Sequence, residues 1–165
     1  DKNGKPTQIL GVATEITERK ENEERITRNE RELRLVTDAM PALVSYVDKD
    51  LRYRQANKTY LEWFGLTFQD IIGKTMKEVL GEEALEKVLP YLETALAGEP
   101  GEFEAEVPYQ HGGPRFVHAI YTPNIQKGEV TGVFIHVLDI SERKRSEEKR
   151  RESEENYRTL FNSID

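Results

Sequence analysis

Residues 139–144 read Asp139-Ile140-Ser141-Glu142-Arg143-Lys144, and this stretch decides how the chain is divided. Alternating apolar residues run up to Ile140, whereas Ser141, a favourable helix N-cap, opens a charged segment without glycine or proline. A strand is therefore expected to end here and a helix to begin. The stretch is echoed 124 positions earlier (139 minus 15) by Glu15-Ile16-Thr17-Glu18-Arg19-Lys20. Without a gap, the same offset aligns Gly4 with Gly128, Thr7 with Thr131, Glu30 with Glu154 and Arg34 with Arg158.

This internal repeat indicates a tandem array. The shared composition of two charged helices would explain matching Glu and Arg residues, but not the match of Gly4 with Gly128. We therefore expect one complete unit between parts of two others. The predicted boundaries are residues 1–16 for the last hairpin of an upstream unit, 17–40 for a helical linker, 41–140 for a globular domain, and 141–165 for a second helical linker and the start of the next unit.

The composition is that of a chain with one modest hydrophobic core. Of the 165 residues, 36% are hydrophobic, and the net charge of −7 is concentrated in residues 39–140, which hold 15 acidic and 9 basic side chains. An acidic domain argues against nucleic-acid binding, which requires a concentrated basic surface. No apolar run approaches the roughly 20 residues of a membrane span, so no membrane partner is predicted within this chain. The chain has no cysteine, which excludes disulfides, thiolate nucleophiles and Cys-ligated metals.

Two charged segments, residues 17–38 and 141–162, are predicted to be helices. In the first, Ile26, Leu33 and Met40 recur every seven residues, but polar residues such as Asn22 and Asn29 occupy interleaved positions. Such a heptad predicts at best a weak coiled coil. Two interpretations stay open: a dimeric signalling helix whose register can shift, or a single amphipathic helix.

The segment between these helices predicts an α+β domain. Alternating apolar residues, and the turns between them, indicate two strands before a group of short helices and three strands after it. Pro90 is expected to kink or split the longest helix. Because both faces of the last strand are apolar, a flanking helix or a second subunit is expected to cover the outer face. The predicted strands are 42–48, 51–56, 102–109, 116–122 and 130–140, and the helices are 58–64, 68–72, 75–80 and 82–97.

Several short motifs occur in a fixed order along this segment. They include Ala56-Asn57 before the first short helix, Ile71-Ile72-Gly73-Lys74, Tyr121-Thr122-Pro123 and the closing motif 139–144. With the order of elements, they make residues 41–144 resemble the PAS domain family, and in particular its PAS fold type 4. The resemblance implies a PAS fold with a five-stranded antiparallel sheet, interposed short helices, and signalling helices at both ends.

The resemblance also implies a role in signalling. PAS units of this kind are sensor and dimerisation modules, often in arrays before a histidine kinase. The chain is therefore expected to bind a small molecule and to relay a signal through its linkers to an output domain in the same chain, as a cytoplasmic homodimer. A ligand-free dimerisation and relay module remains the alternative. No enzymatic activity is predicted, because the sequence has neither a glycine-rich phosphate loop nor a nucleophile elbow.

The three histidines are the residues with most potential for metal or cofactor chemistry. His111 is expected in a turn, whereas His118 and His136 would face each other if the last hairpin centred on Lys127. Two imidazoles without a carboxylate make a poor metal site, so no metal is predicted. Haem-binding relatives take their axial histidine from the long helix, and residues 82–97 contain none. Flavin photochemistry of the light-sensing branch requires a cysteine, so neither haem nor flavin is expected.

A pocket between sheet and helices is where the family binds ligands. Strand alternation and the helix face suggest seven lining residues, although the same side chains would also make a filled core. The resemblance assigns signal coupling to Asp139, Ile140 and Ser141, which join the last strand to the output helix. The predicted lining residues are Tyr53, Trp63, Leu89, Leu92, Phe103, His118 and Ile120.

Overall fold

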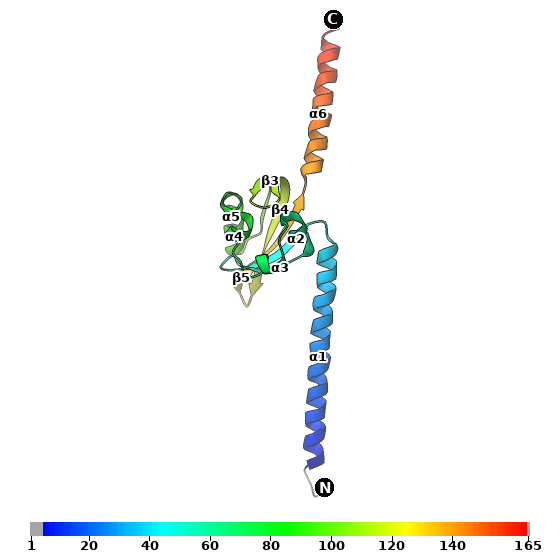
Figure 1. The fold of residues 1–165 in the computed structure, drawn as a ribbon, viewed down its shortest axis with the longest axis vertical. Helices are drawn as coiled ribbons and strands as arrows, with labels where there is room; N and C mark the ends of the chain where they lie inside the picture. The colour runs from blue at the N-terminus through cyan, green and yellow to red at the C-terminus, as the bar shows by residue number, and fades with distance from the viewer. Residues whose placement is uncertain (1–4, 165) are drawn as a thin grey trace. The chain divides into compact units, whose positions relative to one another are not determined.

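The computed structural model describes residues 5–164. The chain divides into two units, the first ending at Ala39 and the second beginning at Met40. A single helix makes up the first, and the second contains the sheet, four short helices and the C-terminal helix (Figure 1). In chain order, the elements are α1 (Lys5–Ala39), β1 (Leu43–Asp48), β2 (Tyr53–Ala56), α2 (Lys58–Phe64), α3 (Phe68–Ile71), α4 (Met76–Leu80), α5 (Glu82–Leu96), β3 (Gly101–Tyr109), β4 (Gly113–Gln126), β5 (Glu129–Asp139) and α6 (Ser141–Asn162).

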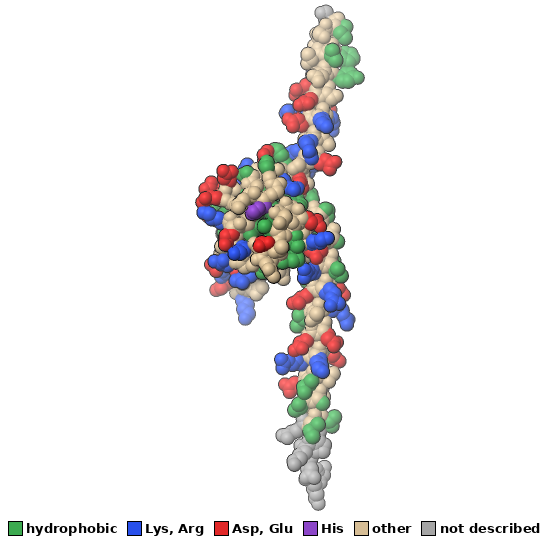
Figure 2. All heavy atoms as spheres, in the orientation of Figure 1, with side chains coloured by type: hydrophobic (Ala, Val, Ile, Leu, Met, Phe, Trp, Pro, Cys, Tyr) green, Lys and Arg blue, Asp and Glu red, His purple; other side chains and the backbone are tan. Residues whose placement is uncertain are grey.

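Helix α1 is longer than the sequence predicts. A hairpin was expected in residues 1–16, but the helix is continuous from Lys5, and the expected turn at Gly4 lies outside the described residues. A strand needs a neighbouring strand for its backbone hydrogen bonds, whereas a helix satisfies them locally. Ile26 and Leu33 of the heptad are 56% and 66% exposed. Acidic and basic side chains are interspersed along α1 and α6 (Figure 2).

The five strands form one antiparallel sheet in the order β2-β1-β5-β4-β3. The first and last strands of the domain are therefore neighbours, and Leu43 at the start of β1 is opposite Val137 near the end of β5. Strand β5 leads directly into α6 (Figure 1). The start of β1, which follows the first linker, thus lies beside the end of β5, which precedes the second linker.

Helix α5 covers one face of the sheet. Its apolar side chains Ala84, Val88, Leu92 and Ala95 are all buried, which is the spacing of one helix face. The helix is not split at Pro90, although proline removes one backbone hydrogen bond. The packing of this apolar face on the sheet holds the parts of α5 before and after Pro90 in one helix.

The two faces of the sheet differ in exposure. Inner-face residues such as Val117, Ala119 and Val137 are at most 4% exposed, because helices α2 to α5 cover them. On the outer face, Phe116 is 38% exposed and Phe134 47%. The expected cover of this outer face by a helix or a second subunit stays a prediction.

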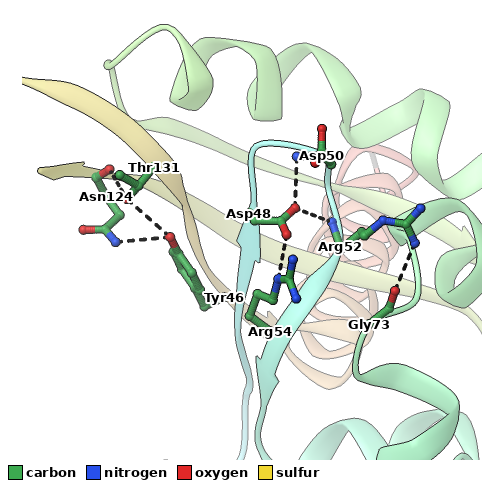
Figure 3. Close-up of polar contacts among 8 residues, drawn as sticks. All are labelled: Tyr46, Asp48, Asp50, Arg52, Arg54, Gly73, Asn124 and Thr131. Atoms are coloured by element: carbon green, nitrogen blue, oxygen red, sulfur yellow. Dashed lines mark hydrogen bonds and ion pairs between the residues drawn. The ribbon is translucent and has the colours of Figure 1, made fainter.

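Polar side chains fix the turn between β1 and β2 (Figure 3). The Asp48 carboxylate accepts hydrogen bonds from the backbone N–H groups of Asp50 (2.9 Å) and Arg52 (3.1 Å) and from Nε of Arg54 (2.6 Å). Partial burial raises the pKa of Asp48, but these hydrogen bonds outweigh it and hold the pKa below its usual value. Arg52 also donates to the carbonyl of Gly73, which ties the turn to the loop after α3.

Candidate functional site: a tyrosine-rich core and two linker junctions

Three of the predicted lining residues meet in the core between the sheet and the helices. Tyr53 and Leu92 are 0% exposed and Phe103 is 8% exposed. The ring of Phe103 stacks on Tyr91 at 4.4 Å and lies 6.1 Å from Tyr121. This inner site is therefore lined by aromatic side chains from β2, α5, β3 and β4.

His118 and Ile120 do not belong to the inner site, contrary to the sequence prediction. Phe103 is paired with Ala119, so the inner face of β4 carries the odd-numbered residues from Val117 to Tyr121. A three-residue connection between Tyr109 and Gly113 sets this register. Because side chains alternate along a strand, a shift of one residue moves the whole set to the other face.

Leu89 and Trp63 lie at the margin of the core rather than inside it. Leu89 is half-buried, because the α5 face that packs on the sheet runs through Val88 and Leu92. Trp63 is half-buried at the end of α2, with its ring 6.5 Å from that of Tyr109. Arg115 places its guanidinium carbon 4.4 Å from the centre of the Trp63 ring.

The two strand histidines are not directly opposite each other. His118 pairs with Leu138 and His136 with Ile120, because the turn is centred between Lys127 and Gly128 and a bulge at Asn124 and Ile125 shifts the register by one further residue. The Nε2 atom of His118 instead lies 2.6 Å from the Glu102 carboxylate. Among residues 5–164, no cluster of three or more His, Cys, Asp or Glu side chains could hold a metal ion.

Four tyrosines are buried in this core, and the sequence prediction named only Tyr53 among them. Burial raises the pKa of Tyr60 to about 12, and also raises the pKa values of Tyr53, Tyr109 and Tyr121. All four phenols therefore stay protonated and can donate hydrogen bonds. Tyr60 shares one with the hydroxyl of Ser45 (2.8 Å). The hydroxyl of Tyr53 is buried and finds no partner among the described residues.

The first linker joins the domain at a buried polar junction around Asn57, which we call the input junction and define as residues 40–44 with Asn57 and Thr59. The Asn57 amide donates to the carbonyl of Ala42 (2.8 Å) and accepts from the backbone N–H of Val44 (3.0 Å). Thr59 donates to the carbonyl of Met40 (3.0 Å). The sequence places Asn57 directly before the first short helix, but its buried contacts across the chain could not be read from sequence.

The second linker leaves the domain at the output junction, which we define as residues 139–141 with Arg115 and Phe116. Arg115 Nη1 donates to Asp139 Oδ2 (2.8 Å), and the Ser141 backbone N–H donates to Asp139 Oδ1 (2.9 Å). Ile140 is buried, and its N–H donates to the carbonyl of Phe116 (2.8 Å). Asp139, Ile140 and Ser141 are thus all hydrogen-bonded to strand β4, and their role in signal coupling stays a prediction.

The electrostatics of the output junction favour an ionised Asp139. Partial burial raises its pKa, but hydrogen bonds from Ser141 and Arg115, and the charge of Arg115, outweigh burial and lower the pKa. The first turn of α6 is also tied to the sheet by charge, because Glu104 on β3 pairs with Arg143 (2.8 Å) and Lys144 (3.7 Å). The first turn of α6 is therefore anchored to two strands.

Comparison with known proteins identifies the family. The PAS fold family matches residues 37–145. The chain is 31% identical over 140 residues to the virulence sensor protein BvgS of Bordetella parapertussis, a match that covers 82% of this chain and 11% of BvgS. It is 26% identical over 124 residues to the two-component sensor PprA of Pseudomonas aeruginosa, covering 73% of this chain and 13% of PprA. The chain thus spans only a small part of the curated relatives it matches.

A solved structure agrees with this assignment. The PAS domain of BvgS from Bordetella pertussis is similar with a TM-score of 0.50 and 25% sequence identity, over 77% of this chain and 98% of that domain. None of the described helices combines the length and hydropathy that a membrane span requires. The five-stranded antiparallel sheet, its interposed helices and the matched residues lead to one conclusion: the chain belongs to the PAS fold family.

Proposed function

We propose that this chain is a sensory PAS module that binds a small molecule in its core and relays a conformational signal through its helical linkers. The output domain, such as a histidine kinase, would lie elsewhere in the same protein. The observation that carries this proposal is the output junction, where Asp139 is bonded both to β4 and to the first residue of α6. The names of the relatives, a virulence sensor and a two-component sensor, support it. The role of the module is regulatory and not catalytic.

A second candidate function is a ligand-free module that dimerises and passes on movement from neighbouring PAS units. The dense inner site favours it, because Tyr53 and Leu92 are completely buried by protein atoms alone. In either case the domain must have two conformational states, and the input must change the free-energy difference between them.

The partners and location that we propose follow from the linkers and the charge. A second copy of the chain would pair through the flanking helices, where Ile26, Leu33 and Val36 are exposed on α1. The polar residues at interleaved positions, Asn22 and Asn29, would weaken this coiled coil and fix its register. The module would act in the cytoplasm, with neighbouring PAS units and the output domain as partners, and without nucleic acid.

Native mass spectrometry of the purified 165-residue chain, followed by a thermal-shift screen of metabolites, separates the two candidates. A ligand at a hundred times its Kd stabilises the folded state by about 2.7 kcal/mol and raises Tm by several degrees. A co-purifying mass or such a shift supports the sensor. A screen without either supports the relay.

Two matched variants locate any ligand that the screen finds. Phe103→Leu alters the inner site, and Phe116→Leu makes the same change on the outer face of the sheet. For a ligand in the core, the thermal shift should fall in the first variant and persist in the second. The opposite result would place the ligand on the outer face and contradict the proposal.

A further inference from the structure

Helix α2 lies between the input junction and the output junction. Asn57 and Thr59 lie at the N-terminal end of α2. Their side chains make hydrogen bonds to backbone groups of Met40, Ala42 and Val44. These bonds are within the domain and are buried or partly buried. Any displacement of the segment that enters β1 therefore acts directly on the first turn of α2.

The other end of α2 is in contact with the output junction through Trp63. The guanidinium of Arg115 stacks on the Trp63 ring at 4.4 Å while its Nη1 atom donates to Asp139 at 2.8 Å. One guanidinium can make both contacts, because the stack uses its flat face and the ion pair uses its edge. Trp63 and Asp139 are thus bridged by a single side chain.

The end of α2 is also packed against the β3–β4 turn that leads to Arg115. Gly112 in this turn approaches the backbone of Trp63 so closely that a Cβ atom there would clash with the Trp63 carbonyl oxygen. Its φ of 80° is also one that side-chain-bearing residues rarely adopt. The turn and the helix end therefore cannot move independently without losing this contact.

The middle of α2 contacts the core. The Tyr60 hydroxyl is 2.8 Å from Ser45 on β1, and the Tyr60 ring packs edge-on against Tyr53 at 5.5 Å. Phe64, one turn later, lies 5.4 Å from Tyr109 on β3. One short helix thus contacts the input junction, the aromatic core and the output junction.

We propose that α2 is a rigid connector that couples the input junction to the output junction through the Trp63–Arg115–Asp139 contact. Displacement at Met40–Val44, or a change in the core at Tyr60, would shift α2 and alter how firmly Arg115 holds Asp139 at the start of α6. The use of this coupling in signalling rests on the proposed function, but the coupling itself is a property of this chain. It differs from direct transmission through the β1–β5 pairing, which does not involve α2.

Hydrogen–deuterium exchange in a double-mutant cycle separates these two routes, since coupling between sites requires such a cycle. Thr59→Val removes the hydroxyl that holds Met40, and exchange is measured at the amides of residues 141–146. We expect exchange there to rise at least about twofold in the otherwise unchanged chain. In a Trp63→Leu background, which keeps the Arg115–Asp139 pair, the same substitution should have no further effect at these amides.

Two controls guard against general destabilisation. Thr94→Val removes another hydrogen bond from a threonine hydroxyl to a backbone carbonyl, that of Pro90 within α5, and should leave the exchange at residues 141–146 unchanged. Thr59→Ser retains the hydroxyl and should restore the exchange seen in the unsubstituted chain. An equal rise at 141–146 in both backgrounds would assign the coupling to the sheet and overturn the connector. No rise in either background would overturn it too.

Trp63 is the only tryptophan in the sequence, so its fluorescence reports on the same contact. Asp139→Asn weakens the hold on Arg115, and Thr59→Val disturbs the far end of α2. Both should change the emission of Trp63, whereas Thr94→Val should not. Unchanged emission in Thr59→Val would count against the connector. If the exchange and fluorescence coupling are present but Thr59→Val leaves the output of the full-length protein unaltered, the connector stands and the proposed signalling function fails.

Discussion

Asp139 and Arg115 form an ion pair of 2.8 Å between neighbouring strands β5 and β4, at the residue where the sheet ends and α6 begins. Both side chains are less than a third exposed, so solvent screens the pair less than it screens pairs on the surface. The same carboxylate accepts the backbone N–H of Ser141. The relationship makes Asp139 a residue of both the sheet and the helix start.

Asp139→Asn should lower the free energy of unfolding by about 1–2 kcal/mol, because the charge-assisted bond to Arg115 is lost and replaced by a neutral one. Urea unfolding followed by circular dichroism measures this loss. Glu99→Gln, which neutralises an exposed acid, should stay within about 0.5 kcal/mol of the unsubstituted chain. Equal effects of the two substitutions would show that the pair adds no stability.

Acid should destabilise the domain through Asp48 and Asp139, whose pKa values are both lowered in the folded state. A lowered pKa contributes stability that is present above the unfolded-state value of about 3.9. That stability is lost as the pH falls through the folded-state value. Unfolding free energy measured between about pH 5 and pH 2 should fall more steeply in the unsubstituted chain than in the Asp48→Asn, Asp139→Asn double variant. Parallel curves would contradict the prediction.

Tyr53→Phe and Tyr60→Phe remove one hydroxyl each from the same core and should have different effects. The Tyr53 hydroxyl is buried without a partner, so its removal should leave stability unchanged or raise it by up to about 1 kcal/mol. The Tyr60 hydroxyl bonds to buried Ser45, so its removal should cost about 1 kcal/mol. Thermal unfolding of the two variants, measured side by side, checks the difference. A cost for Tyr53→Phe as large as that for Tyr60→Phe would imply that Tyr53 has a bonding partner.

Lys127→Asn should stabilise the β4–β5 hairpin. Lys127 and Gly128 have φ values of 51° and 84°, and the two-residue turn that has positive φ at both positions favours Asn-Gly. We expect a gain of roughly 0.5 kcal/mol in the free energy of unfolding. Lys49→Asn, in the β1–β2 turn where φ at this position is not positive, is the matched control and should give no gain. A loss of stability in Lys127→Asn would show that the positive φ of Lys127 does not reduce the stability of the unsubstituted chain.

The order of elements was predictable because it depends on local patterns. Period-two alternation identified the strands, and the closing motif placed the start of α6 at Ser141. The predicted hairpin in residues 1–16 was wrong for the described residues from Lys5 onward, since strand formation depends on neighbours that a local pattern cannot supply.

The composition of the inner site was only partly predictable. Tyr53, Leu92 and Phe103 are buried in the core, as the alternating and helical patterns indicate, and their role in lining a ligand pocket stays a prediction. His118 and Ile120 were assigned to the wrong face, because β4 is apolar enough on both faces for either phase to fit. The contacts of Asn57 and Trp63 link residues far apart in the chain, so no local sequence pattern predicts them.

The sequence by itself determined the family, the order of strands and helices, and the residues at the output junction, since propensity, periodicity and motif spacing are properties of short segments. Only the tertiary structure decided which face of β4 meets the core, because the three-residue connection between β3 and β4 sets the register. It also decided that Arg115 reaches Trp63 and Asp139 together, and that α2 contacts both linker junctions. Those contacts arise when the sheet pairs its first strand with its last, which brings residues about a hundred positions apart into one layer.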